Sequence, residues 1–318
     1  MAGIWVFAEN REQTLELLNA GKDLAGALGA KLAAFTWDRQ LAQEYVACGA
    51  DEVLLLTPLT EAQPLESYDP VIADAAQAED PDVILVVGTH RGKEIAARVA
   101  ARLNTGLCSD CSGFELDQEK KLLKMDRLFF GGLAVQTVIC TTRPQMATIP
   151  PRTFEPATVQ EGKQGQVREL PPPPPSGVQV LQRTPKTREA VDITEAKIVV
   201  CVGRGVAKQE DIALAKELAQ VLGGEVACSR PIAEELHWLP EEVYLGISGK
   251  KVKPDLYVGI GVSGQIQHVT GIRDSKVIFA INRDENAPIF DAADYGIVGD
   301  LYKVVPQLIQ ELKSALKQ

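Results

Sequence analysis

Five consecutive prolines, Pro171–Pro175, interrupt the chain just past its midpoint. Proline fixes one backbone dihedral and lacks an N–H, so this run favours a polyproline II conformation and cannot continue a helix or a central strand. The surrounding segment, 156–193, is rich in Gly, Gln, Glu and Arg and has no period that builds a core. We therefore expect a linker at 156–193 between domains at 1–155 and 194–318. The one strand that this linker could hold is Val178–Leu181.

Apolar runs typical of strands alternate with amphipathic stretches typical of helices in the first domain. The expected strands are Gly3–Ala8, Lys31–Thr36, Glu52–Leu56 and Asp82–Val87. The expected helices are Gln13–Leu28, Leu41–Ala47, Tyr68–Gln77 and Glu94–Leu103. This alternation predicts a parallel sheet with helices on both faces. Shorter strands follow, which we expect to be antiparallel and to extend one edge of that sheet: Leu122–Met125, Leu133–Cys140 and Met146–Ile149.

The same alternation restarts after the linker. The expected strands are Lys197–Val202, Glu225–Cys228, Leu256–Ile260, Lys276–Ile281 and Tyr295–Val298, and the expected helices are Gln209–Leu222 and Tyr302–Leu316. Five parallel strands of this length predict a compact doubly wound sheet. The fold class is therefore α/β with two domains: a Rossmann-like N-terminal domain with a parallel sheet, and a flavodoxin-like or Rossmann-like doubly wound C-terminal domain.

Charge and hydropathy exclude two classes of partner. The formal net charge is −10, so there is no basic excess to neutralise nucleic-acid phosphates. No apolar run approaches the ~18 residues that a membrane span needs, and the N-terminus lacks the basic region of a signal peptide. The six cysteines are scattered over a long chain, which is typical of reduced thiols. We expect a cytoplasmic protein that neither binds nucleic acid nor inserts into membranes.

Polar residues follow every strand of the second domain. They are Arg204, Ser229 with Arg230, the run Ser263 to His268, Asn282 and Asp300. Ligands of open parallel sheets bind at this carboxyl edge, and two arginines on an acidic protein favour an anionic ligand such as a nucleotide. We expect Ser263 to cap a helix whose free N–H groups suit a phosphate, and Gly264 to let the ligand approach the backbone. Any single polar loop residue taken alone is ordinary.

One stretch in this domain matches the dinucleotide fingerprint literally. Gly259, Gly261 and Gly264 form GxGxxG after a strand, and Asp284 follows 20 residues later. The fingerprint belongs in the first strand–helix unit of its domain, however, whereas this match falls in the third strand, with Gly259 inside the strand. A nicotinamide-dependent dehydrogenase is therefore the alternative hypothesis rather than the first one. A nucleotide-binding regulatory module without redox work is a third.

The run Leu256–Leu308 closely resembles the FAD-binding signature of electron transfer flavoprotein alpha subunits. Gly203–Gly205, Ser229-Arg230 and Leu245–Lys250 fit the same family. The resemblance implies that FAD is bound by Arg204, Ser229, Arg230, Leu245, Gly246, Ile247, Ser248, Ser263, Gly264, Gln265, Ile266, Gln267, His268, Asn282, Asp300 and Leu301. The resemblance places Arg204, the loop Ser263–His268, Asn282, Asp300 and Leu301 on the side of the pyrophosphate, ribose and adenine. It places Ser229, Arg230, Ser248, Gln267 and His268 nearer the flavin ring. The Ser248 hydroxyl could then bond the flavin N5, while Arg230 and His268 would stabilise negative charge on the reduced ring.

The resemblance also implies a function and partners. The chain would be the alpha subunit of a heterodimer with an electron transfer flavoprotein beta subunit, and would carry electrons between a flavoprotein dehydrogenase and a second redox partner. Acyl-CoA dehydrogenase, which acts in fatty acid β-oxidation, is the expected dehydrogenase. No acid–base, nucleophilic or metal-ligand pattern argues for substrate chemistry of the chain's own.

Two segments resemble those of the flavin-bifurcating members of the family. They are Thr105–Cys111 and Arg143–Thr148. In such members a second FAD, in the beta subunit, takes electrons from NADH, and Arg143 would be placed to reach it. Cys108 and Cys111 form an isolated CxxC without a second pair or a nearby His, so we expect two free thiols rather than a zinc site.

Overall fold

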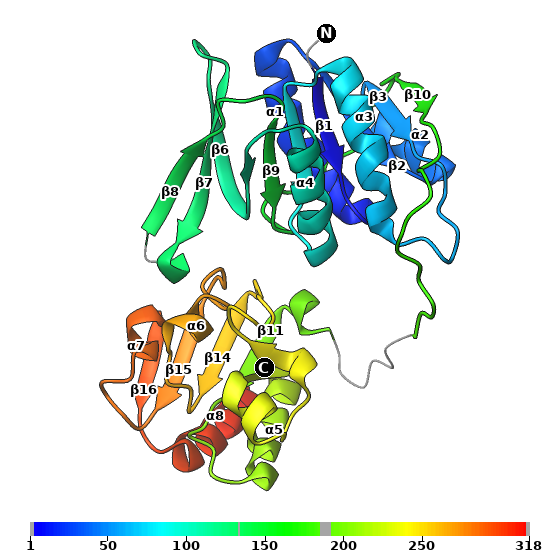
Figure 1. Cartoon of the computed structure of the whole chain (residues 1–318). Helices are drawn as coiled ribbons and strands as arrows, with labels where there is room; N and C mark the ends of the chain where they lie inside the picture. The colour runs from blue at the N-terminus through cyan, green and yellow to red at the C-terminus, as the bar shows by residue number, and fades with distance from the viewer. Residues whose placement is uncertain (1–2, 133, 185–191, 316–318) are drawn as a thin grey trace. The chain divides into compact units, whose positions relative to one another are not determined.

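The computed structural model describes residues 3–132, 134–184 and 192–315 of the chain. The chain forms two compact units, Met1–Thr184 (unit 1) and Pro185–Gln318 (unit 2) (Figure 1). The expected linker at 156–193 therefore falls partly within unit 1, and residues 185–191 lie outside the described ranges. The α/β class with two Rossmann-like domains is confirmed, whereas the domain limits at 155 and 193 stay a prediction.

Unit 1 is built on a seven-stranded parallel sheet in the order β10-β3-β2-β1-β4-β9-β5. Its strands are β1 (Gly3–Phe7), β2 (Lys31–Thr36), β3 (Glu52–Leu55), β4 (Val83–Val87), β5 (Leu107–Cys108), β9 (Gln145–Ile149) and β10 (Gln166–Glu169). The antiparallel orientation expected for Met146–Ile149 is wrong. That segment lies in β9, which pairs in parallel with both β4 and β5 and is buried along its whole length.

Helices cover both faces of this sheet (Figure 1). They are α1 (Arg11–Leu28), α2 (Arg39–Ala47), η1 (Leu65–Tyr68), α3 (Asp69–Glu79) and α4 (His90–Arg102). Alternate residues of β1 point to opposite faces, as strand geometry requires. Ile4 and Val6 pack with α1 and α2, and Trp5 and Phe7 pack with α3 and α4, so the sheet is sandwiched between two cores.

A separate three-stranded antiparallel sheet follows β5. It consists of β6 (Cys111–Asp117), β7 (Leu122–Phe129), the short turn η2 (Phe130–Gly132) and β8 (Ala134–Ile139). The antiparallel pairing is as expected, but these strands form their own sheet instead of extending the parallel one. Leu123 and Met125 anchor it, because both are fully buried in the core beneath α1. Leu133, in the strand expected at 133–140, lies outside the described residues.

The strand expected at Val178–Leu181 is wrong. Those residues are irregular, and the Val180 N–H bonds the carbonyl of Ala62 at 2.8 Å. The strand in this region is β10, which lies earlier and pairs in parallel with β3. Leu170, which follows β10, is buried, and Pro171 comes next. The strand cannot continue through Pro171–Pro175, because proline has no N–H to donate to the neighbouring strand.

Unit 2 contains a six-stranded parallel sheet in the order β13-β12-β11-β14-β15-β16. Its strands are β11 (Ile198–Val202), β12 (Glu225–Ser229), β13 (Tyr244–Leu245), β14 (Leu256–Ile260), β15 (Ile278–Asn282) and β16 (Tyr295–Val298). The five expected strands are present, but the expected count is one too low. β13 is only two residues long, too short to give a period in the sequence.

The two faces of this second sheet are covered unequally. Two long helices, α5 (Ile212–Leu222) and α8 (Leu301–Ala315), pack on one face, with the single turn η4 (Gln209–Asp211) leading into α5. The other face carries only short elements and loops: η3 (Ile193–Glu195), η5 (Pro231–Glu235), η6 (Glu241–Val243), α6 (Ile266–Val269) and α7 (Ile289–Ala292). The element after β14 is therefore one turn rather than a full helix.

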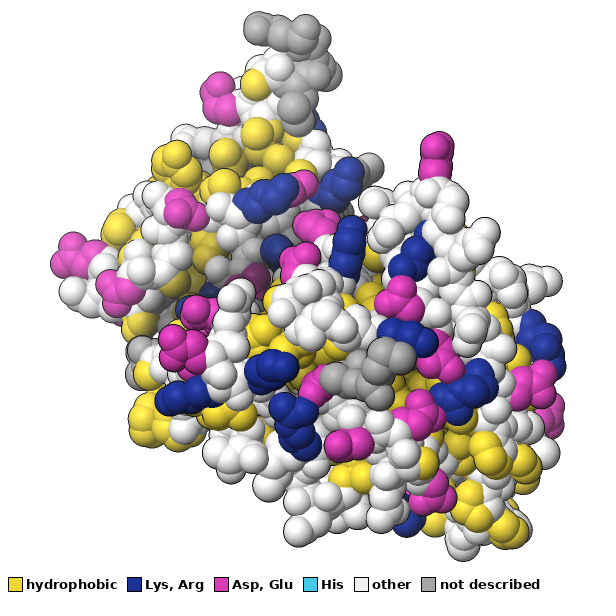
Figure 2. Space-filling model, turned by 90° about the horizontal axis from the view of Figure 1, so that it is seen from above, with side chains coloured by type: hydrophobic (Ala, Val, Ile, Leu, Met, Phe, Trp, Pro, Cys, Tyr) yellow, Lys and Arg dark blue, Asp and Glu magenta, His cyan; other side chains and the backbone are white. Residues whose placement is uncertain are grey.

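Figure 2 shows acidic and basic side chains interspersed over the visible face, without a continuous basic stripe. Within the described ranges, no helix is both long and apolar enough to cross a membrane.

Candidate functional site

The strand order of unit 2 reverses between β11 and β14. From β11 the chain moves outward through β12 and β13, then returns to place β14 on the other side of β11. Such a reversal leaves a crevice at the carboxyl ends of the two central strands, because their loops run in opposite directions. The sequence-predicted residues Arg204 and Ser263–His268 lie in the two loops that flank this point.

The two central loops pack backbone against backbone. The N–H of Gly203 bonds the carbonyl of Ile260, and that of Gly205 bonds the carbonyl of Gly261, each at 2.9 Å. A Cβ at Gly203 would lie 2.3 Å from the Gly261 oxygen. Only glycine allows the two backbones to come this close, so main-chain atoms rather than side chains form the bottom of the crevice.

Each glycine of the GxGxxG match is explained without a dinucleotide. A Cβ at Gly259 would lie 3.1 Å from the ring of Tyr257, so this glycine makes room for a buried phenol. Gly261 has φ +62° and touches Gly205, and Gly264 has φ +79° and would clash with the backbone of Ile289. The match therefore reflects local packing, which weakens the nicotinamide alternative.

The loop after β14 holds five consecutive backbone N–H groups, those of residues 263–267, which we call the donor arc. Among the described residues, none of the N–H groups of residues 263–267 makes a hydrogen bond. Ser263 does not cap the helix as expected. The N-cap position of α6 is Gln265, which makes no side-chain cap, and the Ser263 carbonyl accepts the N–H of Ile289 at 3.0 Å. The side chains of Ser263, Gln265, Ile266 and Gln267 are exposed.

Two of the predicted residues brace the rim of the crevice. The Asn282 amide donates to the carbonyl of Val262 at 2.8 Å, and its oxygen accepts the N–H of Asp284 at 3.0 Å. Asp300 accepts the N–H of Tyr302 at 3.0 Å at the start of α8, next to the buried Leu301. Both side chains hold loops in place: the amide of Asn282 is engaged through its nitrogen and its oxygen, and Asp300 through Oδ1.

The loop after β13 lies against α6. Gly246, with φ +148°, bonds the carbonyl of Lys250, and the Ile247 N–H bonds the carbonyl of Gln267 at 2.8 Å. Leu245 is buried at the end of β13. Ser248 is exposed at the tip, and within the described residues its hydroxyl has no hydrogen-bond partner. The fold thus brings the loop that carries Ser248 into contact with the backbone of Gln267.

The two arginines at this edge differ in their availability. Arg204 is exposed and, as far as the described residues go, makes neither an ion pair nor a hydrogen bond. Arg230 is paired with Glu234 at 2.5 Å, and this hydrogen bond raises the pKa of its guanidinium. Ser229, at the end of β12, is buried beside it. Arg230 would have to leave Glu234 to place its charge over a ligand.

His268 is turned into the protein. Its side chain is buried, with Nε2 2.8 Å from the Tyr257 hydroxyl and 3.9 Å from the Cys201 Sγ. Burial lowers the pKa of His268 to about 4, and the backbone of Leu245 opposes this only in part. The imidazole is therefore neutral at neutral pH. Its Nδ1 is buried and lacks a hydrogen-bond partner within the described ranges.

Sequence reasoning missed Tyr257 and Cys201. Both are fully buried on central strands, and burial raises the pKa of each, so both stay protonated around the imidazole. Gly259, two residues after Tyr257, was the available signal, because residues two apart lie on the same face of a strand and a small one leaves room for a large one.

The two segments of unit 1 that resemble bifurcating members, Thr105–Cys111 and Arg143–Thr148, are in contact with each other. The Thr105 hydroxyl bonds the hydroxyl of Thr142 and the carbonyl of Pro144, each at 2.8 Å. Arg143 forms an ion pair with the buried Asp82, at the amino end of β4. Arg143 is thus engaged with unit 1 itself, and its expected reach toward a second flavin stays a prediction.

The cysteines behave as expected. All six are free and buried, including Cys108 and Cys111. A hydrogen bond from Cys111 lowers the pKa of Cys108, and the same contact together with burial raises the pKa of Cys111. No group of three or more potential metal ligands occurs among the described residues.

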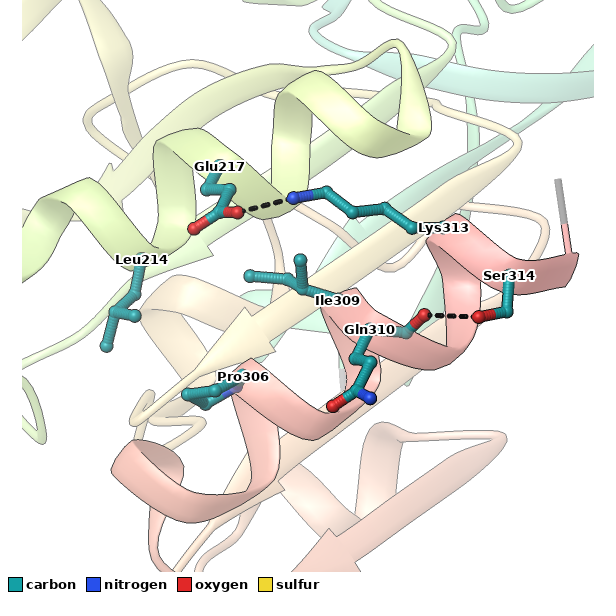
Figure 3. Close-up of a pocket in the computed structure, with 7 residues that line it drawn as sticks. All are labelled: Leu214, Glu217, Pro306, Ile309, Gln310, Lys313 and Ser314. Carbon is teal, nitrogen blue, oxygen red and sulfur yellow. Dashed lines mark hydrogen bonds and ion pairs between the residues drawn. The ribbon is translucent and has the colours of Figure 1, made fainter. Parts of the chain in front are cut away.

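A surface groove lies between α5 and α8, away from the polar rim. Figure 3 shows its lining, Leu214, Glu217, Pro306, Ile309, Gln310, Lys313 and Ser314. The Glu217–Lys313 ion pair, at 2.7 Å, bridges the two helices across it. None of the predicted site residues lines this groove, so the candidate site remains the open carboxyl edge.

Comparison with known proteins gives consistent matches over both units. The family described as "Electron transfer flavoprotein domain" matches residues 4–175, and "Electron transfer flavoprotein FAD-binding domain" matches residues 192–273. A protein from Clostridium saccharobutylicum named "Protein FixB" is 41% identical, over 99% of this chain and 97% of that protein. "Electron transfer flavoprotein subunit alpha" of Clostridium acetobutylicum is 38% identical, over 98% and 97% respectively. "Protein FixB" of Escherichia coli O1:K1 / APEC is 37% identical over 96% of both chains.

Proposed function

Since the chain belongs to the electron transfer flavoprotein family, as a subunit of the alpha or FixB type, we propose that it holds one FAD at the carboxyl edge of the sheet in unit 2. The observation that carries this proposal is the arc of backbone N–H groups at 263–267, which lack acceptors among the described residues. Five donors at a strand-order reversal fit a pyrophosphate, because each can bond an anionic oxygen without displacing an existing bond.

The surrounding residues fit the rest of this cofactor. Arg204 adds a cation beside the arc, and Asn282 and Asp300 fix the loops that border the adenine side. Ser248 and Gln267, from two loops held together by the Ile247–Gln267 bond, would face the flavin ring. When bound, FAD supplies a group that accepts and releases one or two electrons.

In this proposal the protein's own residues control charge and orientation around the ring. Ser248 offers a hydroxyl as a hydrogen-bond donor. Arg230, freed from Glu234, would place a permanent cation near the ring and favour its reduced, negatively charged form. His268 is neutral, because burial lowers its pKa to about 4, so it brings no positive charge to the ring.

We assign the chain the role of electron carrier rather than of a stand-alone enzyme. In this role it pairs with an electron transfer flavoprotein beta subunit. It passes electrons between a flavoprotein dehydrogenase and a second redox partner, and acyl-CoA dehydrogenase is the first candidate for the dehydrogenase. The Cys201 thiol, 3.9 Å from the His268 imidazole, is fully buried and burial raises its pKa, so this pair is not set up as a nucleophile and base, which supports the carrier role. Cytoplasmic location is part of the same proposal.

Flavin bifurcation is a second, finer candidate. The observation in its favour is that Thr105–Cys111 and Arg143–Thr148, both of which resemble segments of bifurcating members, lie side by side in unit 1. Counting FAD in the purified heterodimer tests it. Two FAD per heterodimer would support bifurcation, and one FAD with AMP in the beta subunit would eliminate it.

The substitution Ile266→Pro tests the donor arc directly. Ile266 is the first residue of α6, where proline is tolerated, and Gln265 before it has φ −54° and ψ 147°, the conformation that a following proline requires. The change deletes one N–H that no described residue uses. We expect FAD affinity to fall roughly 10- to 100-fold, because a hydrogen bond to a charged group contributes ~1.5–3 kcal/mol.

The control for this test is Ile266→Ala, which shortens the same side chain and keeps the N–H. FAD uptake is followed by visible absorbance and flavin fluorescence, and folding by far-UV circular dichroism. Equal affinity of the two variants would show that the arc does not bind the cofactor. A wild-type chain that takes up no FAD would refute the proposed function as a whole.

A further inference from the structure

Unit 1 has its own cavity at the carboxyl edge of its parallel sheet. It has a volume of about 450 Å³, within the ~300–1,000 Å³ range of small-molecule pockets. Its charged and aromatic lining residues are two carboxylates, two arginines and two rings: Glu9, Glu61, Arg91, Arg183, Trp37 and Tyr68. Glu9 follows β1, Trp37 follows β2 and Arg91 follows β4, so three neighbouring strands direct their loops to one place. As in unit 2, the strand order reverses here, with β2 and β4 on the two sides of β1.

One end of the cavity is aromatic. The rings of Trp37 and Tyr68 are stacked, with centroids 5.7 Å apart and planes 18° from parallel. Tyr68 is buried, and its hydroxyl is fixed to the carbonyl of Thr57 at 2.9 Å. Trp37 is half-buried and lines the cavity. A rigid, partly exposed indole supported from behind is a stacking platform for a planar ring.

Another part of the lining is cationic. Arg91 is the second residue of α4, a 13-residue helix with no acidic residue in its first turn. Its side chain is 55% exposed and forms a long ion pair with Glu66, with 4.0 Å between Nε and Oε1. Arg183 donates one N–H to the carbonyl of Gln63 at 3.2 Å, which leaves other donors of its guanidinium for a ligand. A helix start beside two arginines favours an anionic group.

A carboxylate at the end of β1 completes the lining. Oε1 of Glu9 accepts a hydrogen bond from the Thr89 hydroxyl, which holds the Glu9 side chain in place at the cavity. A carboxylate is a hydrogen-bond acceptor only, so it suits a ligand that carries hydroxyl groups. The cavity thus offers a stacking surface, hydroxyl acceptors and cations, in one space.

We propose that this cavity binds a nucleoside monophosphate, with the base against Trp37, the ribose hydroxyls toward Glu9 and the phosphate toward Arg91 and Arg183. The site lies wholly within unit 1 and shares no residue with the proposed flavin site of unit 2. It does not rest on the proposed function, and a failure of either leaves the other standing.

The chain has three tryptophans, which allows a site-resolved test. In the full-length protein, each indole N–H gives one NMR signal: Trp37 at the cavity, Trp5 in the core of unit 1, and Trp238 in unit 2. We expect AMP to shift the Trp37 signal saturably and to leave the other two in place. Adenosine should shift the same signal with weaker affinity, since it lacks the phosphate.

Two arginine substitutions supply the matched comparison. Arg91→Ala should weaken AMP binding about tenfold, because it removes a charge-assisted hydrogen bond to the phosphate. Arg39→Ala removes an exposed arginine from the start of α2, paired with Glu169 and outside the cavity, and should leave the affinity unchanged. A Trp37 signal that does not move at millimolar AMP would overturn the proposal. Equal weakening by both substitutions would also overturn it, as it would indicate non-specific charge attraction.

Discussion

Lowering the pH from 7.5 to 5.0 should destabilise unit 2 specifically through His268. Burial lowers the pKa of this side chain to about 4, whereas an unfolded histidine titrates near ~6.5. Between these two values the unfolded chain binds a proton that the native chain does not. The free energy of unfolding is therefore highest above pH ~6.5, where neither state is protonated, and it falls progressively as the pH drops toward 4.

The size of the effect follows from the two pKa values. A difference of roughly 2.5 pKa units corresponds to about 3 kcal/mol in full, and about 2 kcal/mol of this is lost between pH 7.5 and pH 5.0. This is a large fraction of the stability of a domain of this size. The histidine is nine-tenths or more buried, with a relative exposure of 7%, so solvent screening does not reduce the figure much.

The assay compares urea unfolding of the flavin-free, full-length chain at the two pH values. Trp5 and Trp37 are replaced by Phe so that fluorescence reports Trp238, and hence unit 2, alone. His268→Gln cannot take up a proton, so it should lose about 2 kcal/mol less than the parent between pH 7.5 and 5.0. His237→Gln, a substitution of an exposed histidine in the same unit, is the control and should lose as much as the parent.

The comparison between the two pH values removes any constant loss of packing in the His268→Gln variant. If the parent and His268→Gln lose the same free energy between pH 7.5 and 5.0, the imidazole is not held neutral by burial. The assignment of a neutral histidine beside the crevice would then be wrong.

Two further predictions concern stability and are checked by urea or thermal unfolding. Gly203→Ala should lower the free energy of unfolding more than Gly259→Ala does. The Cβ at position 203 would lie 2.3 Å from a backbone oxygen, whereas the Cβ at position 259 would lie 3.1 Å from the Tyr257 ring. The ring can shift at a cost of about 1–3 kcal/mol. The reverse order would show that the two central loops are not held at fixed distance. Arg143→Gln should destabilise unit 1 by about 1–3 kcal/mol, because it leaves the carboxylate of Asp82, 6% exposed, without its cation; a loss within ~0.5 kcal/mol, the usual range of surface substitutions, would contradict this.

The sequence was sufficient for the elements whose side chains repeat with a clear period. The strands at 31–36 and 256–260 and the helix ending at Leu28 follow from apolar periodicity and from Gly29, which adopts the left-handed conformation at the helix end. β10 was missed because its sequence, QVRE, is polar and exposed, as befits the edge of a sheet. The direction of β9 was misjudged, since a strand buried on both faces carries no signal for its neighbours' orientation.

The candidate site shows the same limit. The loops at the carboxyl edge were predictable, because topology brings the ends of parallel strands together whatever their sequence. The orientation of individual side chains was not: His268 points inward to Tyr257, and Arg230 pairs with Glu234 four residues away. Ser263 looked like a helix cap, but the helix begins later, because the loop is tied to Ile289 through its carbonyl. These outcomes depend on contacts between residues that the sequence leaves unrelated.

The backbone contact between Gly205 and Gly261 joins the loop after β11 to the loop after β14, which is synthesised later. During translation β14 leaves the ribosome after β11, β12 and β13, so until then one side of β11 has no partner strand. That open flank is an unprotected strand edge, the type of surface on which nascent chains associate wrongly. The crevice lies between the loops after β11 and β14, so it is complete only once the loop after β14 has been made.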